Sequence, residues 1–171
     1  MRKGYLVPGD NVLAWSRWGD TFCATYTSRN GVVTVGRLWD VALDFHGDGR
    51  APVTSDWAGH WKRDDEAEIY IRRLDDRHLE IEGDASWGGH DPDRVENGSV
   101  HIGQIELTRL RPTGHVLHFI EGSGNSPPAA DAENECMVDL QRQADKLLAK
   151  DNGHCGGMNV SFSGTYQRVA P

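Results

Sequence analysis

Apolar and polar residues alternate along most of the chain, and this pattern predicts β-strands. The longest run covers residues 158–168. Every second side chain of that run falls on one face: Met158, Val160, Phe162, Gly164 and Tyr166. Shorter alternating runs are separated by Gly, Asp, Asn and Pro, which is typical of antiparallel sheets with tight turns.

Eight alternating segments follow residue 56. They lie at 58–63, 67–73, 78–87, 99–111, 115–121, 136–141, 146–150 and 158–168. Eight antiparallel strands can close into a barrel, and closure removes exposed sheet edges. We therefore predict an all-β fold with an antiparallel eight-stranded barrel over residues 57–171. The parity of the 99–111 segment slips near Gly103-Gln104, which predicts a β-bulge there.

Residues 136–150 have two interpretations. Met137, Leu140 and Leu147 fit one face of a helix, whereas Cys136 and Val138 alternate with Leu140 as in a strand. Taken alone, these residues slightly favour the helix.

Residues 1–56 are predicted to form a smaller β-hairpin region, and the Pro-containing stretch 52–56 is the best boundary in the chain. Asn30-Gly31 predicts a type I′ turn, because both of its positions need residues that tolerate positive φ. Counting outward from that turn gives two cross-strand pairs: Tyr26 with Val35, and Phe22 with Trp39.

The net charge of −8 belongs to the second region. Residues 57–171 carry twelve basic and twenty acidic side chains, whereas residues 1–56 carry six of each. This excess argues against nucleic acid and anionic membranes and favours a cationic partner. The basic start has no apolar run behind it, and no stretch is long enough to span a bilayer. We expect either a cytosolic protein or one whose leader is missing.

Metal ligation has one candidate in the sequence. Asp44, His46 and Asp48 resemble a calcium-binding loop, but His46 stands where an oxygen ligand is expected and Ser55 replaces the bidentate Glu. The pattern favours a turn, and we predict no cofactor. The eight His lack the spacing of a helical metal site.

The ending Cys155-Gly-Gly-Met-Asn-Val-Ser-Phe-Ser-Gly-Thr-Tyr-Gln-Arg168 resembles the C-terminus of a group of small, uncharacterised bacterial secreted proteins. They share a CGGxNVxFxGxYxR tail, an upstream Cys and a mid-chain Trp-Gly-Gly, and the resemblance covers Trp57 to Arg168. It implies that 136–141 and 146–150 are two strands and that Cys136 pairs with Cys155. Such a bond would favour a periplasmic or secreted protein. Cys23 would remain a reduced, buried thiol.

Two weaker resemblances concern the barrel. Gly59-His-Trp61 is similar to the Gly-x-Trp that opens lipocalin and avidin-like barrels, and lipocalins often place an Arg over that Trp, as Arg168 could. Ser163-Gly-Thr-Tyr166 is similar to the Ser-Gly-x-x-Tyr motif of bacterial inhibitors of c-type lysozyme, with one spacer residue fewer.

Three functions follow, in this order of preference. The first is a binding or inhibitory module for a protein partner, such as a cationic cell-wall hydrolase like lysozyme. The second is a calyx for a small apolar ligand. The third is an enzyme that uses a His and a carboxylate, for which His90-Asp91 and His154 are the candidates; no catalytic nucleophile can be named. The predicted binding residues are Trp61, Trp87, His154, Ser163, Gly164 and Tyr166.

Overall fold

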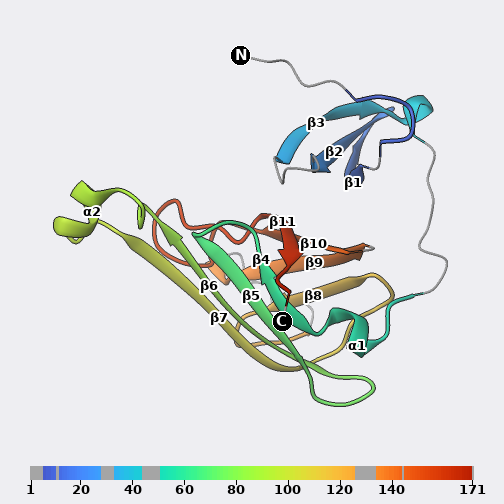
Figure 1. The fold of residues 1–171 in the computed structure, drawn as a ribbon. Helices are drawn as coiled ribbons and strands as arrows, with labels where there is room; N and C mark the ends of the chain where they lie inside the picture. Colours follow the sequence, from blue (N-terminus) through green and yellow to red (C-terminus); the bar gives the residue numbers. More distant parts are fainter. Residues whose placement is uncertain are drawn as a thin grey trace. The chain divides into compact units, whose positions relative to one another are not determined.

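The computed structural model describes residues 6–10, 12–27, 33–43, 51–125, 134–143 and 145–170 (Figure 1). The chain divides into two compact units, Met1–Gly47 and Asp48–Pro171. The predicted all-β fold is confirmed. The first unit holds a three-stranded sheet and the second an eight-stranded antiparallel sheet.

The first unit contains β1 (Leu13–Trp18), β2 (Thr21–Thr27), β3 (Val33–Trp39) and the 3-10 turn η1 (Asp40–Ala42). The three strands follow one another in the sheet in chain order. The predicted register of the second hairpin is wrong by one residue. Tyr26 lies opposite Thr34 rather than Val35, and Phe22 lies opposite Leu38 rather than Trp39.

In the observed β2–β3 register, paired residues are equally distant in sequence from Asn30. A two-residue turn at Asn30-Gly31 would instead place the midpoint of the hairpin between these two residues. The turn itself lies outside the described residues, as does the candidate metal loop Asp44, His46 and Asp48. The observed pairing puts Phe22 and Leu38 on one face and leaves Val35 and Trp39 exposed on the other.

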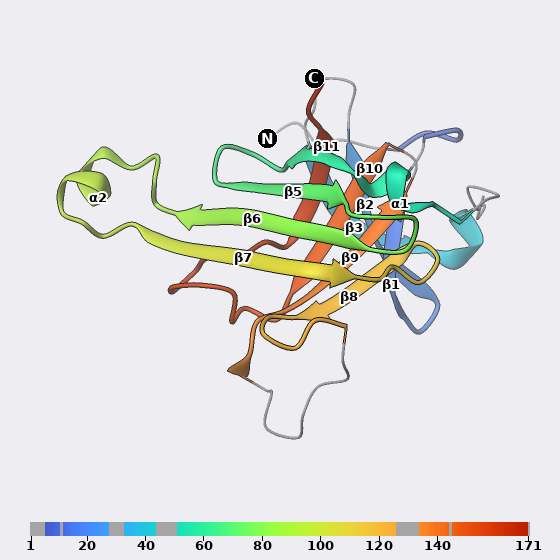
Figure 2. The same cartoon turned by 90° about the horizontal axis from the view of Figure 1, so that it is seen from below.

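The second unit begins with the short helix α1 (Thr54–Trp57). Its strands are β4 (Gly59–Lys62), β5 (Ala67–Arg73), β6 (Leu79–Trp87), β7 (His101–Leu110), β8 (Val116–Ile120), β9 (Met137–Gln143), β10 (Lys146–Asp151) and β11 (Gly164–Arg168), with helix α2 (Pro92–Glu96) between β6 and β7. The sheet order is β7-β6-β5-β4-β11-β10-β9-β8. The sheet curls into a nearly closed barrel whose two edges are β7 and β8 (Figure 2).

A side chain bridges the gap between those two edges. The backbone N–H of Arg111, just after β7, donates to the Asn125 amide oxygen at 2.5 Å. The amide nitrogen of Asn125 in turn donates to the His118 carbonyl of β8 at 2.6 Å. Asn125 therefore links the two edges at a place where no strand pairing joins them among the described residues.

Residues 136–150 form two strands, as the tail resemblance implies, and the helical interpretation is wrong. Val138 and Leu140 point into the core while Asp139 is exposed, and Leu147, Leu148 and Ala149 are buried on the return strand. Burial alternates with a period of two on β9, and pairing with β10 provides hydrogen-bond partners for its backbone N–H and C=O groups.

The last strand is shorter than predicted and begins at Gly164. The Asp151 carboxylate accepts hydrogen bonds from the Ser161 hydroxyl and from the backbone N–H groups of Phe162 and Ser163. These bonds take the place of a strand ladder. The alternation predicts burial correctly for Val160, Phe162 and Tyr166, which lie in the core, but wrongly for Met158, which is exposed, and for Thr165, which is buried.

The predicted bulge in β7 exists but lies further along the strand. The β6–β7 register shifts beyond the Ile81–Leu107 pair, and Arg109 has a positive φ of 59°. The sequence pattern places the slip near Gly103 because Ile102 is apolar, but the Ile102 side chain is exposed and Gly103 faces inward.

Candidate functional site

Large side chains fill the interior of the barrel. The largest fully buried ones are Trp57, Trp61, Tyr166, Phe119 and Phe162. Trp61 Nε1 donates to the Trp57 carbonyl at 2.9 Å, and the Tyr166 hydroxyl donates to the Phe162 carbonyl at 2.8 Å. Burial also raises the pKa of Tyr166. Two of the predicted binding residues, Trp61 and Tyr166, therefore present no surface to a ligand.

Arg168 lies over Trp61, as the lipocalin resemblance leads one to expect. The Arg168 guanidinium carbon is 4.7 Å from the Trp61 ring centre, and that of Arg142 is 4.8 Å away. Both guanidinium groups also donate to the Asp56 carbonyl. This cluster joins α1 to the three strands β4, β9 and β11.

The tail motif forms a second structural cluster. Cys136 and Cys155 form the implied disulfide, with their Cα atoms 4.5 Å apart. Gly156 then passes directly over Gly103 of β7, so that a Cβ on Gly156 would lie 2.7 Å from the Gly103 Cα. Cys23 is a free, partly buried thiol.

Ser163 and Gly164 belong to the same framework. The Ser163 hydroxyl accepts from the Asp151 N–H at 2.9 Å. Arg63 donates to the carbonyls of Ser161 and Ser163, and a Cβ on Gly164 would lie 2.5 Å from the Arg63 side chain. These two predicted binding residues are engaged in holding the segment that leads into β11.

The ends of β6 and β7, together with α2, form an arm that projects from the barrel; we use the name for residues 86–102 (Figures 1 and 2). Trp87, another predicted binding residue, lies at its base. It pairs with His101 across the two strands. The arm extends beyond β5, whose last pairing with β6 is at Ala67–Ala85.

Several contacts fix the arm. The Arg94 guanidinium lies 4.1 Å from the centre of the Trp87 ring, and the Gly88 N–H donates to the Glu66 carboxylate at 3.1 Å. The Asp91 carboxylate accepts from the N–H groups of Asp93 and Arg94, as an N-cap residue does.

The disulfide-bonded tail supports the arm from the barrel side. The Gly157 N–H donates to the Ile102 carbonyl at 3.1 Å, and His101 Nδ1 donates to the Met158 carbonyl at 2.6 Å. The glycine contact between Gly103 and Gly156 allows this close approach.

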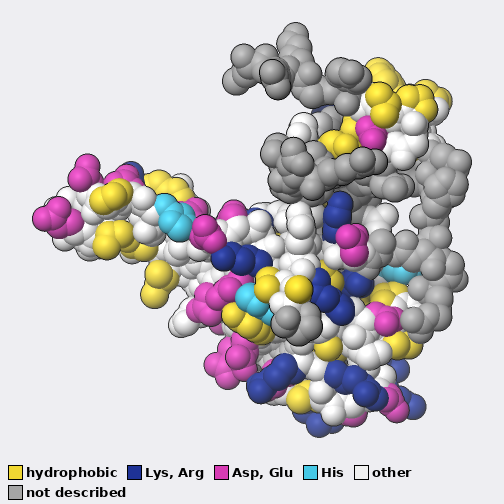
Figure 3. Space-filling model, in the orientation of Figure 1, with side chains coloured by type: hydrophobic (Ala, Val, Ile, Leu, Met, Phe, Trp, Pro, Cys, Tyr) yellow, Lys and Arg dark blue, Asp and Glu magenta, His cyan; other side chains and the backbone are white. Residues whose placement is uncertain are grey.

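The arm exposes two kinds of side chain, as Figure 3 shows. Its carboxylates Asp91, Asp93 and Glu96 are all exposed. The apolar side chains of Val95 and Ile102 are 56% and 66% exposed, and Met158, which adjoins the arm, is 72% exposed. The sequence pattern does not reveal this surface, because a helix of five residues between two strands leaves no periodic signal.

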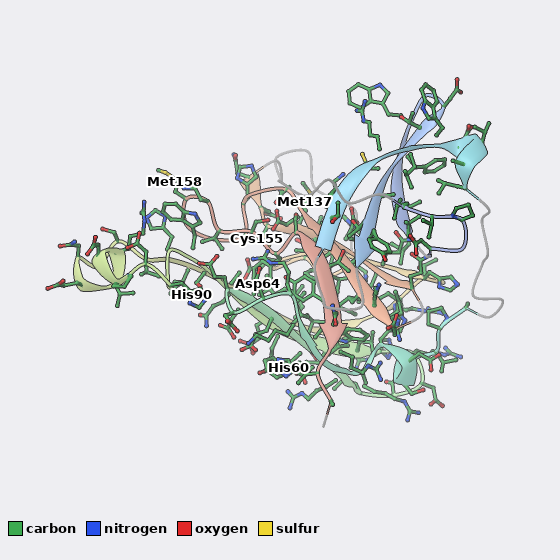
Figure 4. All side chains as sticks on the ribbon, turned by 45° about the horizontal axis from the view of Figure 1, so that its top comes forward. His60, Asp64, His90, Met137, Cys155 and Met158 are labelled. Atoms are coloured by element: carbon green, nitrogen blue, oxygen red, sulfur yellow. A yellow bond between two sulfur atoms is a disulfide. The ribbon has the colours of Figure 1, made fainter. Side chains whose placement is uncertain are left out.

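The structure does not bring together the predicted catalytic groups. His90 and His154 are both exposed, and the Asp91 carboxylate caps α2 and contacts Arg94. No contact among the described residues joins His154 to His90 or Asp91. His60 instead pairs with Glu68 at 2.9 Å on the barrel body, well apart from His90 (Figure 4).

The outer face of β4, β5 and β6 carries a surface pocket of about 300 Å³. It is lined by Gly59, Tyr70, Ile71, Arg72, Glu80 and Glu82. A signal for it was present in the sequence: Tyr70 is an aromatic residue at a position that alternation assigns to solvent.

Groups that could hold a metal ion are absent from the described part of the chain. Its helices are also too short to cross a membrane. No known protein family, curated protein or solved structure matches this chain.

Proposed function

We propose that this protein is a binding module that acts on a cationic protein through the β6–β7 arm, with a cell-wall hydrolase such as c-type lysozyme as the partner. The arm is the observation that carries the proposal. It projects from a barrel whose interior is filled, and it exposes acidic and apolar side chains together.

Fixing the arm before binding favours affinity. A loop that must become ordered on binding loses conformational entropy, whereas a pre-organised one does not. Arg94 on Trp87 and Gly157 on Ile102 hold the arm at its two sides.

Charge favours a basic partner. The arm carries three exposed carboxylates and one guanidinium, Arg94, which contacts both the Trp87 ring and Asp91. Complementary charge raises the association rate and excludes acidic partners. The exposed Val95 and Ile102 would supply the apolar centre of such an interface.

Calorimetric titration of the full chain with a c-type lysozyme at low and at physiological salt tests the proposal, together with an assay of bacterial cell lysis. The variant D91N/D93N/E96Q removes the three charges, and Asn at position 91 still caps α2. We expect the association constant to fall by about tenfold and to become less dependent on salt, because the complementary charge is lost.

The matched control is E121Q/E135Q/D145N, which neutralises three exposed carboxylates outside both the arm and the outer pocket. Its binding should stay close to that of the unchanged chain. Equal weakening by both variants would mean that only net charge matters. Absence of binding to any c-type lysozyme would overturn the choice of partner.

A further inference from the structure

We propose that the pocket on the outer face of β4, β5 and β6 binds an alkylammonium or alkylguanidinium cation, such as the end of a lysine or arginine side chain. The pocket is separate from the arm. Only the source of the cation, a basic partner, rests on the function proposed above.

The wall of the pocket is aromatic. The Tyr70 ring lines it and stacks on His60, with ring centres 4.2 Å apart and planes 11° from parallel. Tyr70 is 39% exposed. An exposed aromatic ring attracts cations through its negative face, and its carbon skeleton covers an alkyl stem. Burial and the neighbouring Glu68 raise the pKa of Tyr70 above its ordinary value.

The rim already holds a guanidinium. Arg72 Nη2 lies 2.5 Å from Glu80 and 3.0 Å from Glu82, so these two carboxylates have the spacing to bind such a group. Arg72 is largely exposed, and exposed ion pairs are weak. An incoming cation can therefore displace it.

The surroundings contain more negative charge than Arg72 neutralises. Cross-strand pairing places Glu82 opposite Glu106 and Glu68 opposite Asp84, and like charges in such positions repel. Glu106 has no ion-pair partner among the described residues. A bound cation would relieve this repulsion, whereas an anion or a neutral ligand would not.

The volume of the pocket suits the end of one side chain better than a larger small molecule. About 300 Å³ is at the lower end of the range for small-molecule pockets. Ile71 is buried, and Gly59 has no side chain, so the backbone closes the inner end of the pocket.

The test is an NMR titration of the full chain with butylguanidinium and butylammonium chlorides at constant ionic strength. Sodium chloride and butanol serve as matched probes for the charge and for the alkyl group. We expect the backbone amides of Tyr70 and Ile71 to shift saturably with both cations and with neither control.

Two variants give opposite expectations. E82Q should weaken cation binding by about tenfold, because it removes one of the two carboxylates. R72A should strengthen it by removing the competing guanidinium. E121Q, an exposed carboxylate elsewhere, should change nothing.

Absence of saturable shifts at the pocket, or unchanged binding in E82Q, would overturn the pocket as a cation site. Weaker binding in R72A would also overturn it, because Arg72 would then be part of the site rather than its competitor. None of these outcomes affects the arm, which is tested with the protein partner.

Discussion

At the scale of single residues, the residues of the tail motif have structural roles. Cys155 forms the disulfide, Val160 and Phe162 lie in the core, and Tyr166 bonds the Phe162 carbonyl. Asn159 has a positive φ of 67°, a conformation that Asn tolerates better than most residues. A motif with this many packing roles needs no catalytic explanation.

Gly103 is the residue at which a single methyl group should matter most. A Cβ there would overlap the Cys155 carbonyl oxygen and crowd the Val160 side chain. We expect Gly103→Ala to lower the free energy of unfolding by about 3 kcal/mol or more, measured by denaturant titration.

Gly98→Ala is the control for that substitution. Gly98 has a φ of 65°, but a Cβ there meets nothing within 4 Å. It should cost about 1 kcal/mol from backbone strain alone. Equal effects of the two substitutions would contradict the glycine contact between β7 and the tail.

At the scale of elements, the turn between β5 and β6 contains a titrating group. Asp75 accepts from the side chain of His78 and from the N–H groups of Arg77 and His78. These bonds, the His78 side chain first, lower the pKa of Asp75 from 3.8 to about 2.

A lowered pKa in the folded state means that the ionised Asp75 stabilises the fold above the ordinary pKa. That contribution is lost as the pH falls from 3.8 towards 2. We expect Asp75→Asn to reduce the fall in melting temperature over this window, followed by circular dichroism. Asp145→Asn, at an exposed position, should retain the full fall. An unchanged acid profile in Asp75→Asn would show that the carboxylate does not contribute.

Strand positions could be predicted from the sequence because burial alternates on the barrel strands. The bounds of β5 match the prediction residue for residue, and those of β6 differ only at the start. Other features depend on contacts between distant residues. The Asp151 side chain ends the ladder before Gly164, and a tail segment rather than a strand covers Gly103. Neither effect leaves a periodic pattern.

The candidate sites were harder to predict for a related reason. Aromatic residues in an alternating pattern can either pack in the core or line a ligand-binding cavity. Trp61 and Tyr166 pack in the core. The arm and the outer pocket depend on which polar positions of neighbouring strands meet, and only the register shows this.

At the scale of the whole molecule, the disulfide should contribute to the stability of the barrel unit. It closes an interval of 19 residues that contains β9 and β10. Such a crosslink contributes about 3 kcal/mol, mainly by restricting the unfolded chain. We expect a reductant, or Cys136→Ser with Cys155→Ser, to lower the melting temperature by several degrees in calorimetry.

Cys23→Ser provides the control, since Cys23 is a free thiol in the other unit. It should leave the melting of the barrel unit and its response to reductant unchanged. A barrel unit that melts at the same temperature with and without reductant would contradict the prediction.

The bridge through Asn125 has a consequence for how separate copies of the chain meet. An open strand edge offers free N–H and C=O groups on which another chain can add a strand and begin a fibril. Here the Asn125 amide donates to the His118 carbonyl on β8, and the Gly157 N–H donates to the Ile102 carbonyl on β7. The β6–β7 register is also interrupted by the bulge near Arg109, and bulges make an edge less regular. These contacts occupy part of each open edge, so they should hinder the addition of a strand from another copy although the barrel is not fully closed.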